Sequence, residues 1–394
     1  MRGPTRTSPT LLLVATVSGT VRHFLRPYAT HLRALGWRVD AAASHVTDDR
    51  AVKDAFDAVH ELPLSRSIRD LAGIVRGEQA IALILDEIRP DIVHVHTPIA
   101  SFVTRLAARR VPADRRPAVI YTAHGFHFHE GGRPLTNAIF LTAERIAGRW
   151  TDRLVVINDE DERAARNHRI VRSDRLVRMR GIGLDTVAVH PVQVGPEATK
   201  DSRRRLGVPA DVAMFVIVGE LNANKRQSDA IDALAMMRTE TAHLVIIGTG
   251  PTLSQLEAQA DRLEMSGRVH FSGFLNDVPA VLAGATALIA TSAREGLSRS
   301  VMEALALEVP VIASSARGNR ELVGDSGWIV ATGDIATMAE KMDWIIDHPD
   351  DRQAMGRRGR VRMVEQYDIH DLILRHEALY RAVLAERDVV AGLG

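Results

Sequence analysis

The sequence predicts an α/β protein with two doubly wound domains, each a parallel sheet covered by helices on both faces. Continuous apolar runs of strand length, such as 10–17 and 212–218, suit strands that are buried on both faces. Segments with helical periodicity follow such runs. After 189–196, which contains two prolines and few large apolar residues, the strand–helix alternation starts again. A chain of 394 residues is long for one core and suits two domains.

The same patterns give the expected boundaries, which are a disordered leader (1–9), an N-terminal domain (10–190), a linker (191–198), a C-terminal domain (199–367) and a C-terminal helix (368–394). Within the C-terminal domain, 334–363 is expected to form one amphipathic helix. Because strands and helices alternate on both sides of the linker, a cleft is expected between the two domains.

The composition is that of an ordinary globular protein, with 46% apolar and 25% charged residues. A formal net charge of +1 gives no reason to expect nucleic-acid binding. Residues 1–195 nevertheless hold 28 Lys and Arg against 21 Asp and Glu, and the remainder holds 22 against 28. The basic half suits an anionic partner, such as a lipid surface or a diphosphate-linked acceptor, although solvated arginine-rich faces explain the excess equally well. The absence of cysteine excludes disulfides and thiolate chemistry.

The first residues superficially resemble a secretory signal, because Arg2 and Arg6 precede the apolar run 11–15. That run is short, and the helical pattern after it continues a strand–helix unit. No window of the sequence reaches the length of uninterrupted apolar residues that spans a membrane. We therefore expect a cytoplasmic protein that is soluble or peripheral at the membrane.

Two carboxylates flank a predicted strand-to-helix turn in the second half. Glu295 and Glu303 lie eight positions apart, after the apolar run 285–290 and at the start of a buried helix. In open α/β sheets, ligands bind beyond the carboxyl ends of the strands, and the free N–H groups of a helix start attract phosphate. Carboxylates suit hydroxyl groups, so this turn predicts a ligand with phosphates and hydroxyls, such as a nucleotide sugar. Alternatively, 300–303 is a capping box in which Glu303 only caps its own helix.

This spacing resembles the Glu-x7-Glu motif of glycosyltransferase family 4, whose members are retaining enzymes with the GT-B fold of two Rossmann-like domains facing a central cleft. The resemblance implies that Glu295 lies by the donor sugar and that Glu303 binds the ribose hydroxyls. It also implies that the turn residues Gly296, Leu297 and Ser298 line the donor site. The last helix of such enzymes crosses back to the first domain.

Strand ends in the first half carry further parts of the resemblance. Gly19 follows the first strand, where it would let a phosphate approach the backbone, although tight turns use glycine anyway. Residues 121–132 read YTAHGFHFHEGG and resemble a family 4 subgroup that acts on undecaprenyl-diphosphate-linked sugars. By that resemblance Gly19 faces donor and acceptor, His124 contacts donor-sugar hydroxyls, and the residues near the acceptor are Phe126, His127 and Phe128. An equally good interpretation places His127 in a polar loop near a sheet edge.

His94 and His96 share one face of a predicted strand, as a pair of metal ligands would. No third ligand accompanies them at a useful spacing, so we expect no metal site there.

Lys225 follows a strand and a glycine in the second domain, in the segment Gly219–Lys225. Family 4 enzymes commonly carry an arginine directly after this glycine and a lysine five residues later, both in contact with the diphosphate. Lys225 fits this pattern, whereas Glu220 stands in the place of the arginine. We hypothesise that Arg317 restores the missing positive charge. Taken alone, Lys225 is as easily an ordinary exposed lysine.

The resemblance implies a retaining transferase that moves a hexose or N-acetylhexosamine from a UDP-sugar to a polyprenyl-diphosphate-linked saccharide at the inner leaflet. No essential metal or other cofactor is expected, because Lys225, helix N-termini and backbone N–H groups would stabilise the leaving diphosphate. The expected partners are the UDP-sugar, the lipid-linked acceptor and an anionic membrane surface, and not nucleic acid.

Two other classes of function stay open. A UDP-sugar 2-epimerase shares this scaffold, and a fold alone does not determine chemistry. A non-catalytic nucleotide-sugar-binding protein is the other class, favoured only by Glu220. A glycosidase fits less well, because carboxylates at a phosphate-attracting helix start do not suit that chemistry.

Overall fold

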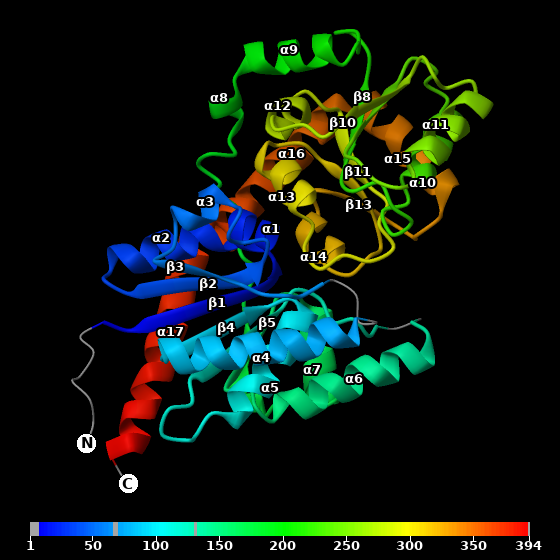
Figure 1. Ribbon diagram of the computed structural model, residues 1–394. Helices are drawn as coiled ribbons and strands as arrows, with labels where there is room; N and C mark the ends of the chain where they lie inside the picture. Colours follow the sequence, from blue (N-terminus) through cyan, green and yellow to red (C-terminus); the bar gives the residue numbers. More distant parts are fainter. Residues whose placement is uncertain (1–7, 66–69, 130–131, 393–394) are drawn as a thin grey trace. The chain divides into compact units, whose positions relative to one another are not determined.

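The computed structural model describes residues 8–65, 70–129 and 132–392, and the chain divides into two compact units (Figure 1). Unit 1 runs to Ile182 and includes the C-terminal stretch from His370, whereas unit 2 spans Gly183–Ile369. Of the expected leader 1–9, residues 1–7 lie outside the described residues. Within the described ranges, no helix is long and apolar enough to cross a membrane.

Unit 1 is built on a seven-stranded parallel sheet with the order β3-β2-β1-β4-β5-β6-β7. Its strands are β1 (Thr10–Val17), β2 (Arg38–Ser44), β3 (Ala58–Glu61), β4 (Ile92–His96), β5 (Ala118–Ala123), β6 (Arg153–Val156) and β7 (Leu176–Arg178). Its helical segments are α1 (Ser18–Thr20), the π-helix η1 (Val21–Leu25), α2 (Arg26–Ala34), α3 (Arg50–Lys53), α4 (Leu71–Ile88), α5 (Pro98–Arg110), α6 (Pro134–Gly148), α7 (Asp159–Asn167), the 3₁₀ turn η2 (Ser173–Arg175) and α17 (Ile369–Gly392).

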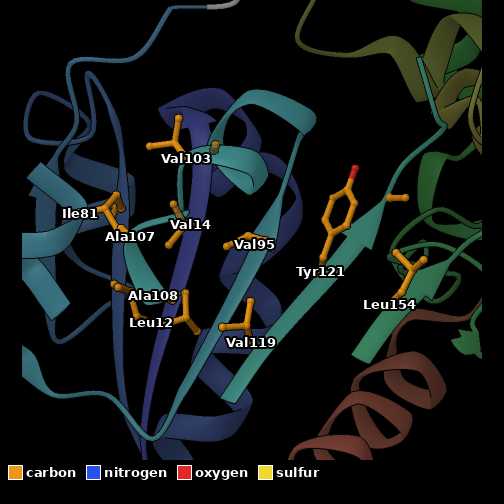
Figure 2. Close-up of a cluster of buried hydrophobic side chains, with 14 of the residues drawn as sticks. Leu12, Val14, Ile81, Val95, Val103, Ala107, Ala108, Val119, Tyr121 and Leu154 are labelled. Atoms are coloured by element: carbon orange, nitrogen blue, oxygen red, sulfur yellow. The ribbon is translucent and has the colours of Figure 1, made fainter. Parts of the chain in front are cut away.

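One face of this sheet packs against α4 and α5. Leu12 of β1 and Val95 of β4 belong to the same buried cluster as Ile81 of α4 and Val103 of α5, as Figure 2 shows. Successive side chains of a strand point to opposite faces, so the alternate residues of these strands need a second cover. Central strands that are apolar throughout are therefore buried on both sides.

The second face is covered by η1, α2 and the C-terminal helix α17. Leu11 and Leu13 of β1 are buried together with Tyr380 and Val383 of α17, and Figure 1 draws α17 in red beside the strands of this sheet. The first and last residues of unit 2 lie side by side in the structure. The backbone N–H of Ile369 donates to the carbonyl of Leu184 (3.0 Å).

Unit 2 repeats this plan with six parallel strands in the order β10-β9-β8-β11-β12-β13. Its strands are β8 (Met214–Val218), β9 (His243–Ile247), β10 (Val269–Gly273), β11 (Ala287–Ala290), β12 (Val311–Ser314) and β13 (Gly327–Val330). Its helices are α8 (Pro191–Val194), α9 (Pro196–Arg205), α10 (Gln227–Met236), α11 (Leu253–Arg262), α12 (Val278–Ala283), α13 (Arg299–Ala306), α14 (Asn319–Val323), α15 (Ile335–Asp347) and α16 (Pro349–Tyr367).

Helices cover both faces of the second sheet as well. One buried cluster joins the sheet to α12, α13, α14 and α16, and another joins its opposite face to α10, α11 and α15. Two doubly wound parallel sheets confirm the predicted α/β class.

Prolines account for two differences from the expected segments. Residues 191–198, expected as the linker, lie within unit 2 and form α8 and the start of α9. Pro191 and Pro196 stand in the first turns of these helices, where the fixed φ of proline fits and its missing N–H is not needed. The segment 334–363, expected as one helix, is two, because Pro349 begins α16 and disfavours helical backbone at the residue before it.

Candidate functional site

Each sheet has one point at which the strand order reverses. This point lies between β1 and β4 in unit 1 and between β8 and β11 in unit 2. Ligands of open α/β sheets bind there, outside the carboxyl ends of the strands. The segments that follow these four strands are therefore the candidates for ligand contact.

In unit 2, the segments after β8 and β11 are joined by hydrogen bonds. Asn222 Oδ1 accepts from the backbone N–H groups of Asn224 (3.0 Å) and Lys225 (3.1 Å), as in an Asx turn. Asn224 Nδ2 donates to the carbonyl of Arg294 (3.1 Å), and the N–H of Ala293 donates to the carbonyl of Asn224 (2.8 Å). The position of Lys225 is thus fixed relative to the turn that carries Glu295.

Lys225 and Glu295 form an ion pair at this junction. Lys225 Nζ contacts Glu295 Oε1, which also accepts from Ser292 Oγ (2.7 Å). Thr291 Oγ1 donates to the carbonyl of Lys225 (2.7 Å). The side chains of Lys225 and Glu295 remain 23% and 15% exposed, so a ligand could still reach both. A cation that can neutralise phosphate and a carboxylate that can accept from a hydroxyl lie together at the strand reversal.

Helix α13 begins directly after this turn, with Ser298 as its N-cap residue. Ser298 makes no side-chain cap hydrogen bond, and its Oγ lies 3.1 Å from Ser300 Oγ. The alternative capping box at 300–303 is not formed, because Ser300 lies inside the helix. Glu303 pairs instead with Arg299, four residues earlier on the same helix face (Oε1 to Nε, 2.8 Å). Its half-buried carboxylate thus pairs with a side chain and does not cap the helix start.

The segment after β12 packs backbone against backbone on the same turn. Gly318 has a φ of +79°, and a Cβ there would lie 1.6 Å from the carbonyl oxygen of Gly296. This contact and this φ both require glycine. Arg317 precedes the contact and is half-buried, while Leu297 packs against the core of unit 2. Gly296, Leu297 and Arg317 therefore belong to the junction that holds Glu295.

Glycines also let chain segments approach closely after β8. A Cβ on Gly219 would lie 3.1 Å from Lys225 Cε, so the lysine stem passes over this glycine. A Cβ on Gly248 would lie 1.9 Å from the carbonyl oxygen of Gly219. Glu220 comes next in the chain and is exposed. The place where an arginine was expected by resemblance thus presents a carboxylate to solvent.

In unit 1, Gly19 lies in α1 directly after β1. A Cβ at this position would meet nothing within 4 Å, so the space beside Gly19 is open. Its φ is not in the left-handed region, so the backbone conformation alone does not require glycine there.

Four histidines form a continuous stack on the face of the first sheet that α17 covers. The ring centroids are 5.8 Å apart for His376 and His94, 4.2 Å for His94 and His96, and 5.3 Å for His96 and His124. His124 is half-buried and the other three are fully buried. Burial lowers the pKa of all four, to about 4 for His124 and for His376, so each ring is neutral near pH 7. Within the described part of the chain, no group of three or more His, Asp or Glu is arranged to hold a metal ion.

The three residues expected near the acceptor do not share one environment. Phe126 and Phe128 are buried in the core of unit 1 and stack on each other with ring centroids 4.9 Å apart. His127 lies between them in sequence, is exposed, and has its ring 5.1 Å from that of Phe140. The backbone turns at Gly125, whose φ is +126°, and the two phenylalanines then point inward. Of the three, only His127 has a side chain that an acceptor could contact.

The comparison with known proteins decides the family. The sequence model described as Glycosyltransferase Family 4 matches residues 17–180, and the one described as Glycosyl transferases group 1 matches residues 198–362. "Putative glycosyltransferase EpsD" from Bacillus subtilis (strain 168) is 33% identical over 89% of this chain and 91% of that protein. The chain belongs to glycosyltransferase family 4. The suspected family is therefore confirmed.

Other relatives of this family 4 glycosyltransferase carry more specific names. "UDP-Gal:alpha-D-GlcNAc-diphosphoundecaprenol alpha-1,3-galactosyltransferase" from Escherichia coli is 24% identical over 79% of this chain and 80% of that protein. Among solved structures, a glycosyltransferase from Rickettsia africae matches with a TM-score of 0.80 at 16% identity, covering 96% of this chain and 99% of that one. HepE from Anabaena in complex with UDP matches with a TM-score of 0.77 at 19% identity, covering 95% and 100%. These likenesses confirm that the glycosyltransferase has the GT-B fold.

The sequence patterns did not indicate the residues that hold the site of this glycosyltransferase in shape. In unit 2 these are Asn222, Asn224, Thr291 and Ser292. Short polar side chains directly after an apolar strand were their only sequence signal. Nothing in the sequence indicated that His376 would stack on His94.

Proposed function

We propose that this glycosyltransferase transfers a hexose or N-acetylhexosamine from a UDP-sugar, with retention of configuration, to a polyprenyl-diphosphate-linked saccharide during the synthesis of a surface polysaccharide or glycan. The ion pair of Lys225 and Glu295 at the strand reversal of unit 2 carries this proposal. Relatives named as a diphosphoundecaprenol-dependent galactosyltransferase and as a capsular polysaccharide glycosyltransferase support it. A solved structure of similar fold in complex with UDP supports the donor.

In this proposal the donor is held by groups of unit 2. Lys225 exchanges its contact with Glu295 for the diphosphate, and the N–H groups at the start of α13 add positive potential. Glu295 accepts from hydroxyls of the transferred sugar, and Glu303 accepts from those of the ribose. Arg317 supplies the charge that Glu220 does not. Such an arrangement stabilises the leaving diphosphate without an essential metal ion.

The proposed chemistry needs no dedicated protein base. The acceptor hydroxyl attacks the anomeric carbon from the face that the diphosphate leaves, and its proton passes to the departing phosphate oxygen. One carbon–oxygen bond to phosphate breaks while the new glycosidic bond forms, so configuration is retained. His124 is neutral near pH 7, which suits a hydrogen bond to a sugar hydroxyl rather than a charge.

A lipid-linked acceptor places the enzyme at the inner leaflet of an anionic membrane, and α6 suits such contact. It exposes Leu135, Ile139 and Ile146 along one helix face, with Arg145 also exposed. We expect the double substitution Leu135→Ser and Ile139→Ser to weaken binding to vesicles that contain phosphatidylglycerol, measured by co-sedimentation. Leu83→Ser on α4, which is equally exposed, is the matched control and should not weaken it. Equal binding by all variants would exclude α6 as the contact.

The decisive experiment measures UDP release from a panel of UDP-sugars, with and without a lipid-diphosphate-linked saccharide, in EDTA. Release that depends on the acceptor and persists in EDTA supports the proposal and identifies the donor. A converted sugar without UDP release would instead indicate an epimerase, and binding without turnover a non-catalytic protein. Arg317→Ala should weaken donor binding; an unchanged affinity would reject its proposed role.

A further inference from the structure

His96 is the last residue of β4, and His124 directly follows the neighbouring strand β5. Their side chains meet at the carboxyl ends of these two strands. Strands β4 and β5 pair in parallel with His96 opposite Thr122. Because side chains two positions apart share a face of a strand, His124 follows Thr122 on the face that carries His96. The two rings lie nearly parallel, with an interplanar angle of 24° and centroids 5.3 Å apart, and His96 Nδ1 lies 3.1 Å from His124 Nε2. This distance is that of a hydrogen bond between two imidazoles.

The position of the shared hydrogen follows from the second nitrogen of each ring. A neutral imidazole has one N–H and one bare nitrogen, so one ring must donate and the other must accept. If His124 donated from Nε2, then His96 would carry its own hydrogen on Nε2. That atom is fully buried and has no hydrogen-bond partner among the described residues. If His96 donates from Nδ1, the buried Nε2 is a bare nitrogen instead.

A buried N–H without an acceptor is rarer in proteins than an under-satisfied acceptor. We infer that His96 donates from Nδ1 to Nε2 of His124 and thereby holds the hydrogen of His124 on Nδ1. His96 is then a positioning residue, and its role in sugar transfer rests on the proposed function.

The rest of the stack keeps His96 in place. His94 Nδ1 lies 2.6 Å from the hydroxyl of Tyr380, and His94 Nε2 lies 2.7 Å from Thr122 Oγ1. Both nitrogens of His94 are therefore engaged, and its ring packs against that of His96. Because both ring nitrogens of His94 have hydrogen-bond partners, its ring cannot move to make room for a rotation of His96. The Nδ1 atom of His96 therefore stays directed at His124.

The tautomer decides what His124 can do to a substrate. With hydrogen on Nδ1, the half-buried ring can donate to a sugar hydroxyl or phosphate oxygen and cannot take a proton at that atom. The opposite tautomer would present a bare nitrogen, which could act as a base. His96 thus selects a hydrogen-bond donor over a base, in agreement with a transfer in which the leaving phosphate accepts the proton.

The test uses the full-length protein labelled with ¹⁵N at histidine, because long-range ¹H–¹⁵N correlations show which ring nitrogen carries the hydrogen. His124→Gln assigns the signals. His96→Asn keeps a donor near the position of Nδ1, whereas His96→Leu removes it. Tyr380→Phe disturbs the far end of the stack and is the matched control for general loosening. Transfer kinetics of each variant are measured alongside.

We expect the hydrogen of His124 on Nδ1 in the wild type, in His96→Asn and in Tyr380→Phe, and a shift toward Nε2 in His96→Leu. The kcat/KM of His96→Leu should fall roughly 2- to 10-fold, the effect of one lost neutral hydrogen bond, and His96→Asn should restore it. Hydrogen on Nε2 in the wild type would overturn the inference, and this reading requires only that the assigning variant His124→Gln folds. The expected tautomer in a protein that transfers no sugar would reject the proposed function and leave the hydrogen-bond assignment standing.

Discussion

Lys225 and Glu295 form an ion pair, and this pair leads to a specific expectation for UDP binding. The cation proposed to hold the diphosphate already contacts the carboxylate proposed to hold the sugar. Glu295→Gln removes this competing anion and also removes a negative charge beside the diphosphate. We therefore expect UDP to bind more tightly to Glu295→Gln, although sugar transfer should fall about 100-fold or more.

The exposure of the pair sets the size of the effect. Lys225 is 23% and Glu295 15% exposed at the side chain, so the pair is neither fully buried nor at the open surface. Exposed ion pairs contribute at most about 1 kcal/mol, and breaking a buried pair costs about 3–5 kcal/mol. A competing interaction of about 1–2 kcal/mol corresponds to roughly 5- to 30-fold in affinity.

Isothermal titration of UDP into the wild type and Glu295→Gln measures this directly. Glu303→Gln is the matched control, because it removes the same charge eight positions later in the chain. Since Glu303 is proposed to accept from the ribose, its variant should bind UDP more weakly, by about 10-fold or more. If Glu295→Gln binds UDP no better than the wild type, the competition between Glu295 and the diphosphate is refuted.

Four further substitutions and one pH dependence test other parts of the structure. Gly318→Ala should lower the free energy of unfolding by about 2 kcal/mol or more, because its Cβ meets the carbonyl of Gly296 and its φ is +79°; an unchanged melting temperature would contradict this contact. Phe126→Ala should cost about 3–5 kcal/mol in urea unfolding, whereas His127→Ala should leave stability within about 0.5 kcal/mol and raise the KM for the acceptor. Burial lowers the pKa of His376 to about 4, below the value of about 6.5 in an unfolded chain. The unfolded state therefore takes up the proton first, so the contribution of His376 to stability is full above about pH 6.5 and falls by up to about 3 kcal/mol toward pH 4; His376→Phe should show a smaller total fall than the wild type.

The central strands of both sheets were predictable because their signal is local. They are predominantly apolar runs, most clearly β1 and β8, as expected for strands covered on both faces. The edge strands β3 and β7 were not predicted, because Ala58–Glu61 and Leu176–Arg178 are short and half-buried and therefore lack that signal. The crossing between the units was placed later in the chain than at Gly183, because two prolines and few large apolar residues in 189–196 were interpreted as a linker, although Pro191 begins α8.

The sequence assigned Lys225 and Glu295 to one donor site by resemblance, and it did not predict that the two side chains meet. Lys225 and Glu295 follow the two strands that flank the reversal of the second sheet, so their approach follows from strand order. The aromatic residues after β5 show the limit of such reasoning. After the turn at Gly125, the side chain of Phe126 lies in the core and that of His127 lies at the surface. No spacing rule gives the direction of that turn. The stack of His376 on His94 depends on the return of α17, far along the chain.

The position of Glu220 bears on how the donor diphosphate is neutralised. Glu220, which stands where related enzymes carry an arginine, is exposed after β8. Lys225 pairs with Glu295, so a glutamate at position 220 does not draw the lysine away from the site. A single lysine balances only part of the charge of a diphosphate, and in the proposed donor site the remainder is assigned to backbone N–H groups near α13 and to Arg317. Backbone dipoles act only over the first turn of a helix, so they depend on how closely the ligand approaches the backbone. In the proposed site, donor binding should therefore depend on the backbone geometry that the contact between Gly318 and Gly296 holds, as well as on Lys225 and Arg317.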